Sequence, residues 1–236
     1  MERSDLADPP ARIRPVSQPR GEDARRRILD AALELFARDG FDRASTRDLA
    51  ERAGVNLPAI QYYFGSKEGL YRTVVEEIIH LMDSRIGPLA TRIQTELETA
   101  DPSRAQLVAM LREIIEAVVG LMLDDAAPGR QVRQKFFARM EAEPDAAFEA
   151  LQACMIRTVC VPCRLLVGRL TGLPADDERV LLRVMTTIGL AKVFCGWGVA
   201  GFLGWTTIGP DRVRIVQTTI GDQIEDLFLQ ERSSTV

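Results

Sequence analysis

The chain has 236 residues, of which 46% are hydrophobic and 27% are charged, and its formal net charge is −4. This composition is typical of a protein with one large folded domain or two modest ones. The negative net charge argues against a protein that coats nucleic acid non-specifically, because that mode of binding needs a broad basic surface. The single histidine, His80, leaves few candidates for general-base or zinc chemistry, which argues against an enzyme, a metal site or a cofactor.

No secretory signal opens the chain, so we expect a cytoplasmic protein. The longest weakly polar run, from Val193 to Ile208, is too short to span a bilayer and holds four glycines, so we interpret it as buried protein. The four cysteines lie in apolar surroundings: Cys154, Cys160, Cys163 and Cys195. In a reducing compartment such thiols behave as small hydrophobic side chains, and no disulfide framework is indicated.

Residues 1–22 are expected to form a disordered arm, because the first 18 carry three prolines and no apolar period. A helical pattern begins at Arg25, and Gly40 follows it where a left-handed C-terminal cap would lie. Ser45 and Asp48 then have capping-box spacing for a short second helix, which Gly54 ends. Asn56 is a good N-cap for a third helix over residues 57–63.

The remaining sequence predicts further helices, and no alternating strand pattern appears. Gly87 and Pro88 are expected to break the fourth helix, and Pro162 is expected to kink a later one. The predicted ranges are 67–86, 89–99, 103–123, 129–141, 145–170, 176–203 and 211–230. The fold class is therefore all-α, with a helix-turn-helix domain over residues 23–70 and a larger helical domain over residues 71–236.

Two short helices joined at Gly54, with a third packed behind them, are the minimum that can place a helix end in a major groove. The residues from Thr46 to Asn56, and then from Ile60 to Leu70, resemble the signature of the tetracycline-repressor (TetR) family. This order and spacing extend over 25 residues, from Thr46 to Leu70. The segment Arg139-Met140-Glu141, ahead of Pro144, weakly resembles the CerR-like branch of that family.

The resemblance implies a DNA-binding transcription regulator, and it assigns roles to individual residues. Leu57, Pro58 and Ala59 would open the recognition helix and face base edges, where apolar side chains read only thymine methyls or groove shape. Gln61 and Arg47 are the candidates for sequence reading, because each can hydrogen-bond to a base edge. The candidates for phosphate contact and for the rest of the interface are Thr46, Asn56, Tyr62, Tyr63 and Lys67.

Plainer interpretations exist for some of these residues. Tyr62, Tyr63 and Phe64 can be core aromatics and Gln61 a solvated side chain; we favour the core role for Phe64 and DNA contact for the two tyrosines. The run from Leu57 to Gln61 departs from the family's commonest recognition helix, which leaves the operator sequence open. The cluster from Arg25 to Arg27, together with Arg12, Arg14 and Arg20, can let the arm follow a minor groove, although a solvated charge run is the favoured interpretation of the arm.

A homodimer is expected, because one short helix offers too few contacts and paired half-sites supply the rest. The last helix carries an apolar stripe that suits an intersubunit four-helix bundle, which the TetR resemblance also implies; packing against its own core is the less favoured alternative. The predicted interface residues are Val213, Val216, Ile220, Ile224, Leu227 and Phe228.

Large apolar side chains in the middle helices are candidates to line a pocket for a small hydrophobic effector, although such stripes are more often plain core. The candidates are Phe136, Phe137, Met140, Met155, Phe194 and Trp197. An effector can bind more tightly to a dimer conformation in which the two recognition helices are too far apart or too close for the operator. It would then shift the conformational equilibrium away from the DNA-bound state. The expected function is therefore a ligand-released repressor that binds a pseudo-palindromic operator as a dimer.

Two motifs compete with this interpretation. The glycines at 196, 198 and 201 match a dinucleotide fingerprint as a string, but no strand precedes them, so we interpret them as close helix packing. Cys160 and Cys163 form a CxxC pair, which leaves thiol or redox sensing as an alternative. A helical enzyme or a protein-interaction module is the remaining alternative, and no convergent set of titratable groups favours the enzyme.

Overall fold

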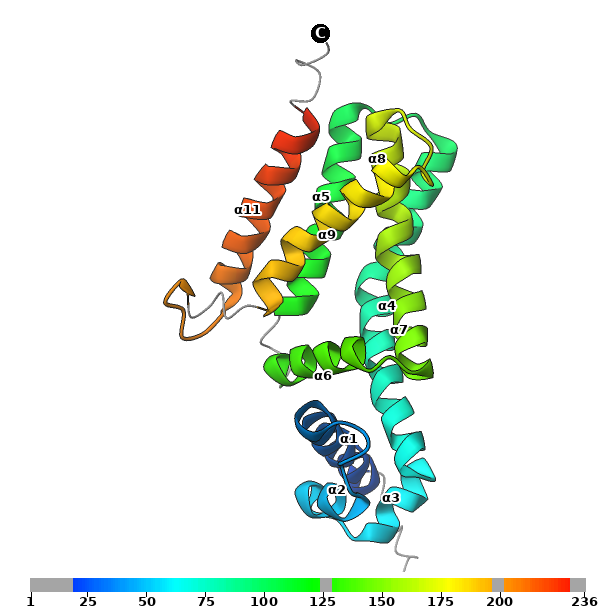
Figure 1. Ribbon diagram of the computed structural model, residues 1–236, viewed down its shortest axis with the longest axis vertical. Coiled ribbons are helices and arrows are strands. Elements are labelled where there is room, and N and C mark those ends of the chain that lie inside the picture. Colours follow the sequence, from blue (N-terminus) through cyan, green and yellow to red (C-terminus); the bar gives the residue numbers. More distant parts are fainter. Residues whose placement is uncertain (1–18, 124–128, 197–201, 230–236) are drawn as a thin grey trace, which may run out of the picture.

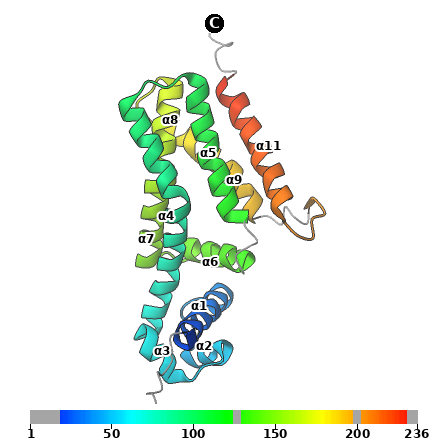
Figure 2. The same cartoon turned by 180° about the vertical axis from the view of Figure 1, so that it is seen from behind.

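The computed structural model describes residues 19–123, 129–196 and 202–229. Helices α1, α2 and α3 gather at one end of an elongated molecule, and α5, α8, α9 and α11 form a bundle at the other (Figure 1). The long helix α4 runs between the two ends, and α6 lies across the middle, above α1. Figure 2 shows the same arrangement from behind, with α7 beside α4.

All regular structure in the described residues is helical, which confirms the predicted all-α class. The helices are α1 (Pro19–Asp39), α2 (Thr46–Ala53), α3 (Leu57–Phe64), α4 (Lys67–Thr99), α5 (Arg104–Leu123), α6 (Arg130–Ala142), α7 (Ala146–Met155), a π-helical turn (Ile156–Cys160), α8 (Val161–Thr171), α9 (Glu178–Gly196) and α11 (Pro210–Leu229).

Helix α1 starts earlier than the sequence pattern indicated. It begins at Pro19, so the assignment of residues 19–22 to a disordered arm was wrong, and the rest of the predicted arm lies outside the described residues. Proline is tolerated in a first helical turn, because its missing N–H would have no partner there. Glu22 stabilises the same end through the helix dipole.

Helices α1, α2 and α3 and the start of α4 form a small N-terminal head, and its helix ends are capped as predicted. The Ser45 hydroxyl accepts a hydrogen bond from the Asp48 N–H at the start of α2. Gly54 ends α2 in the left-handed conformation, with φ of 62°. The head closes around a core contributed by all of its helices, formed by Ile28, Leu35, Phe36, Leu49, Ile60 and Leu70.

Helix α4 passes through Pro88 without a break, so the predicted division into two helices was wrong. Pro88 lies on the exposed side of the helix, where the carbonyl that loses its hydrogen bond can face solvent. The opposite side carries an unbroken apolar stripe of Met82, Ile86, Ala90 and Ile93 that is buried on both sides of the proline. Burial of this stripe outweighs the local cost of the proline.

The helical run from α7 to α8 is irregular just before Pro162, where a kink was predicted. One π-helical turn, Ile156–Cys160, joins the two helices, and Pro162 lies in the first turn of α8. The whole run, Ala146–Thr171, is long and apolar enough to cross a membrane by length and composition alone. In the structure it packs against α4 and α5, as a core helix would.

The distal bundle is centred on α5, which packs most extensively against α11 and also against α8 and α9. This packing corrects the predicted dimer interface. Val216, Ile220, Ile224 and Phe228 are buried within their own subunit, so the alternative of packing against the chain's own core holds for them. Of the other two predicted residues, Leu227 is exposed and Val213 is partly buried.

Candidate nucleic-acid interface

Helix α3 is held by one side chain and presents the others outward. Ile60 is the buried residue of this helix, with 2% of its surface exposed, and it packs into the head core. The Asn56 side-chain oxygen accepts a hydrogen bond from the Ala59 N–H at 3.2 Å and so caps the helix. Pro58 occupies the first turn without loss, as predicted. Helix α3 is therefore fixed to the head core through Ile60, with its other side directed outward.

The outward side of α3 carries the residues predicted to read DNA. Leu57, Pro58, Gln61 and Tyr62 are all exposed, and Tyr62 has 82% of its surface open to solvent. Arg47, at the start of α2, is exposed as well. Figure 1 places α3 at the end of the molecule farthest from α8. A side chain amide, a guanidinium and a phenol are thus available to base edges and phosphates.

The remaining predicted DNA-contact residues are less exposed to solvent. Tyr63 is partly buried and stacks edge-on with Tyr62 at 5.0 Å between ring centroids. Thr46 and Ala59 are also partly buried. The Lys67 ammonium donates to the Phe41 carbonyl oxygen at 3.0 Å and lies 4.4 Å from the centre of the Phe41 ring. Lys67 therefore serves the packing of the head, with two N–H donors remaining for a phosphate.

The arginine cluster of α1 is engaged inside the head. Arg25 lies over the Phe64 ring at 5.6 Å and forms an ion pair with Glu77, while Arg27 donates to the Gly54 carbonyl oxygen. Phe64 is partly buried against the core, in agreement with the favoured core role. Arg12 and Arg14 lie outside the described residues, as does the Arg20 side chain.

A cavity of about 220 Å³ lies at the junction of the head and the larger helical domain. The structure brings Phe136 and Met140 of the predicted effector set to its wall, together with Phe36, Phe41 and Tyr71 from the head side. Three other members of the set lie away from it. Phe137 and Phe194 are half-buried elsewhere, Met155 is exposed, and Trp197 lies outside the described residues.

Arg139 on α6 joins the two domains beside this cavity, a role that sequence reasoning missed. Its guanidinium donates to the carbonyl oxygens of Asp39 at 3.4 Å and Arg38 at 3.2 Å, at the end of α1. A cation in this position satisfies terminal carbonyls and complements the helix dipole. The only sequence signal was the position of Arg139 within the weak branch resemblance.

Tyr71 closes the same cavity from α4. Its pKa is raised, first by burial and then by the charge of Asp145 and hydrogen bonding to it. The ring also makes an edge-on contact with Phe36 at 5.3 Å and lies 5.8 Å from Phe136. The hydroxyl is thus held protonated, which gives the cavity a polar rim around an aromatic floor.

The CxxC pair lacks the environment of a reactive site. Cys163 is fully buried and Cys160 is partly buried, and burial raises the pKa of both thiols. A raised pKa disfavours the thiolate, which is the reactive and metal-binding form. Within the described ranges no group of three or more metal-ligating side chains occurs. The structure thus gives no support to the thiol-sensing alternative.

A capped second helix, an outward-facing third helix and a supporting first helix define a helix-turn-helix DNA-binding protein. Residues 28–74 match the family model described as "Bacterial regulatory proteins, tetR family". Residues 107–229, more than half of the chain, match the C-terminal domain of the HTH-type transcriptional dual regulator CecR. The chain belongs to the TetR family and carries a CecR-type C-terminal domain, which confirms the family predicted from the sequence.

Individual relatives agree with this assignment. The dual regulator CecR from Shigella flexneri is 29% identical over 219 residues, which cover 92% of this chain and 96% of CecR. The regulator RutR from Escherichia coli is 40% identical over 95 residues, covering 35% of this chain and 45% of RutR. The protein is therefore a DNA-binding transcriptional regulator of a non-enzymatic family.

Solved structures share the fold. A TetR-like transcriptional regulator from Rhodococcus sp. RHA1 matches with a TM-score of 0.55 at 18% identity, over 90% of this chain and 97% of that one. A TetR-family regulator from Streptomyces coelicolor matches with a TM-score of 0.56 at 13% identity, over 88% and 89%. At these identities the match concerns the arrangement of helices alone.

Proposed function

We propose that the protein is a cytoplasmic repressor that binds a pseudo-palindromic operator as a homodimer and leaves it when a small hydrophobic effector binds. The observation that carries the proposal is the outward side of α3, where Gln61 and Tyr62 stand exposed on a helix anchored by Ile60. Because the CecR relative is called a dual regulator, activation from the same operator is the alternative to repression.

In this proposal a few specific side-chain contacts supply most of the affinity for DNA. Gln61 and Arg47 read base edges, and Tyr62 and Thr46 hold the phosphate backbone. Asn56 keeps its side-chain N–H groups available for phosphate, since its oxygen is used in the cap. Acidic residues Asp48 and Glu51 lie exposed beside them on α2, so bulk attraction contributes little.

The dimer is proposed to form through the apolar surface that α9 and α11 leave uncovered. Leu182 and Met185 on α9 are each more than 60% exposed, and Ile215 on α11 is more than half exposed. Exposed apolar side chains gathered on neighbouring helices are typical of a protein interface. Pairing of α9 and α11 with their counterparts would bury them in an intersubunit four-helix bundle, which is the interface proposed in place of the buried stripe.

Release is proposed to act through the junction cavity and α6. A hydrophobic ligand in a space of about 220 Å³ would contact Phe136 and Met140 on α6 and Tyr71 on α4. Because Arg139 on the same helix holds the end of α1, a shift of α6 would reorient the head. Only a ligand that binds the shifted state more tightly can lower the affinity for DNA.

The test of DNA binding is a gel shift with the DNA that flanks the protein's own gene, at moderate salt. We expect specific retardation by the wild-type protein and its loss in Tyr62→Ala, because that side chain contributes to binding and not to the core. The matched control is His80→Ala, which removes an exposed ring on α4. Absence of specific retardation by the wild type would overturn the proposal.

The test of release compares the wild type with Met140→Trp, which fills the junction cavity. Hydrophobic compounds are screened for those that raise the melting temperature of the wild type but not of the variant. We expect such compounds to lower operator affinity in the gel shift. If they bind the wild type tightly and leave operator affinity unchanged, release by this cavity is refuted.

A further inference from the structure

The first two turns of α1 lie along helix α3. A Cβ atom at Gly21 would lie 3.4 Å from the Tyr63 hydroxyl oxygen. One turn later, the Arg25 guanidinium lies 5.6 Å from the centre of the Phe64 ring. Figures 1 and 2 both show the dark-blue start of α1 beside α3. The N-terminal end of α1 therefore belongs to the end of the molecule that carries α3.

Tyr63 connects this end of α1 to the exposed side of α3. Its ring lies 5.0 Å from the ring of Tyr62, which has 82% of its surface open to solvent. The chain that precedes Pro19 therefore joins the head next to the side of α3 that is proposed to face DNA.

The basic stretch, residues 9–20, ends at this point. It contains three arginines, four prolines and no acidic residue, whereas Glu2, Asp5 and Asp8 all come earlier in the chain. Arginine side chains are attracted into narrow minor grooves by the strong negative potential there. Proline restricts the backbone of any chain, so less entropy is lost when a proline-rich stretch is ordered on DNA.

The basic stretch is long enough to pass from one groove to the next. Arg14 and Arg12 precede Pro19 by five and seven residues, so they can lie at most about 17 and 24 Å from it. One turn of the double helix is about 34 Å, so the minor groove next to a major groove is about half of that distance away. With α3 in a major groove, both arginines would reach the adjacent minor groove.

The start of α1 itself is not basic. Glu22 and Asp23 are exposed in its first turn, and Arg25 and Arg26, about one turn later, are each paired with a carboxylate. Acidic side chains repel the phosphates of DNA. The stretch before α1, and not α1, is therefore the part suited to a contact with DNA.

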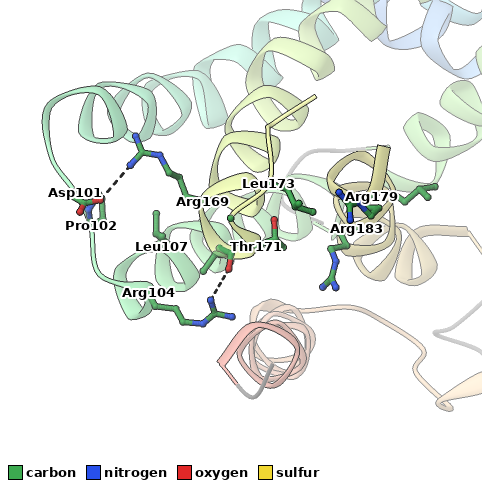
Figure 3. A pocket seen from close by; sticks show the side chains of 12 residues that line it. Asp101, Pro102, Arg104, Leu107, Arg169, Thr171, Leu173, Arg179 and Arg183 are labelled. Atoms are coloured by element: carbon green, nitrogen blue, oxygen red, sulfur yellow. Dashed lines mark hydrogen bonds and ion pairs between the residues drawn. The ribbon is translucent and has the colours of Figure 1, made fainter. Parts of the chain in front are cut away.

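Another group of arginines lies at the opposite end of the molecule, around a cleft of about 890 Å³ (Figure 3). Three of them are held by the fold. Arg104 donates to two backbone carbonyl oxygens, both at 2.7 Å. Arg169 lies 3.5 Å from the Asp101 carboxylate, and Arg179 lies 2.8 Å from a carboxylate oxygen. This cleft is far from α3, so it does not extend the surface that faces DNA.

We propose that the basic stretch binds DNA together with α3, with Arg12 and Arg14 in the minor groove that flanks the half-site. This contact replaces the solvated charge run that the sequence alone favoured. The inference rests on the proposed placement of α3 in a major groove. It adds a reading of A·T against G·C pairs beyond the bases that Gln61 and Arg47 face, because the minor groove distinguishes these two classes of base pair.

The test measures binding of the full chain to a duplex that it selects from a random-sequence pool, by fluorescence anisotropy at about 50 to 200 mM salt. We expect Arg12→Gln combined with Arg14→Gln to weaken binding by about tenfold at the lower salt. The slope of log K against log salt should fall by about one for each arginine. The matched control, Arg3→Gln, removes a charge outside the basic stretch and should change neither quantity.

Base substitution in the flanking DNA separates a minor-groove contact from a phosphate contact. Inosine·cytosine pairs present the minor-groove face of A·T and the major-groove face of G·C, because inosine lacks the N2 amino group. We expect the wild type to bind A·T and inosine·cytosine flanks alike and G·C flanks more weakly. The double variant should bind all three equally.

Equal affinity and equal salt slope in the wild type and the double variant would overturn the proposal. A loss of the same size on all three flanks would leave a phosphate contact and refute the minor-groove assignment. If the wild type selects no sequence, the proposed operator fails. The same comparison on poly(dA-dT), poly(dI-dC) and poly(dG-dC), which need no operator, then decides the role of the two arginines.

Discussion

Lys192 on α9 and Glu141 on α6 are joined by an ion pair of 2.6 Å between Nζ and Oε1. Glu141 lies two residues from Arg139, which holds the carbonyl end of α1. Helix α6 therefore contacts the reading head on one side and, on the other, a helix of the proposed dimer surface. A change in α9 can therefore reach the head through α6.

The strength of this pair can be measured with a double-mutant cycle of Lys192→Glu and Glu141→Lys. Both side chains are about half exposed, so solvent screening should limit the coupling to about 0.2–1 kcal/mol. We expect each single variant to lower the free energy of unfolding in urea and the swapped pair to restore most of it. Strictly additive losses would show that the pair does not couple α9 to α6.

Gln61 is expected to set operator sequence, because it is exposed on α3 and an amide can bind an adenine edge in two places. Gln61→Ala should relax discrimination at one base pair by about 1–3 kcal/mol. Tyr62→Phe, the comparison variant, should weaken all sequences alike because a phosphate contact carries no base information. Fluorescence anisotropy with single-base operator variants measures both. A uniform loss in Gln61→Ala would contradict the assignment.

Gly40 tests the link between Arg139 and α1. It has φ of +83°, and a Cβ there would lie 2.6 Å from Arg139 Nη1. Gly40→Ala should therefore strain the backbone at this positive φ and also break the Arg139 hydrogen bonds. Gly172→Ala is the matched control, since it has φ of +71° and no atom within 4 Å. We expect an extra loss of about 1 kcal/mol in urea unfolding for Gly40→Ala, from the hydrogen bonds alone. Equal losses would mean that the Arg139 contact contributes nothing.

Met185 tests the proposed dimer surface. Met185→Asp places a charge on an exposed apolar side chain of α9, and we expect the protein to sediment as a monomer with reduced operator affinity. Met155→Asp is the matched control, because Met155 is exposed on α7, away from α9 and α11. Analytical ultracentrifugation separates the outcomes. A dimer that survives in Met185→Asp would exclude this surface.

Asp177 gives a test that depends on pH. Hydrogen bonds from Arg179, first from its side chain and then from its backbone, lower the Asp177 pKa from 3.8 to about 2. The folded state therefore gains stability from this pair above pH 3.8 and loses it as the pH falls through about 2. NMR at about pH 3 should find the carboxyl mostly ionised in the wild type and more protonated in Arg179→Gln, which loses the side-chain hydrogen bonds and keeps the backbone one. Equal ionisation in the two proteins would refute this cause of the shift.

The local features of the head follow from neighbouring residues, which is why the sequence predicted them. Ser45 and Asn56 cap helices whose first free N–H groups lie three residues away, and Gly54 supplies the left-handed turn between them. Because these local interactions set where α3 begins, the sequence also predicted which residues of α3 are exposed. The family followed from the same stretch of chain, and the all-α class followed from the helical patterns along the whole sequence.

Tertiary packing decided what spacing along the chain leaves open. An apolar stripe is the same pattern whether its partner is another subunit or α5, and in α11 the partner of Ile220 and Ile224 is α5. Pro88 sits inside α4 because the buried side of that helix gains more than the proline costs. The tie from Arg139 to α1 spans a hundred residues, and it exists only because the folded chain lays α6 across the end of α1.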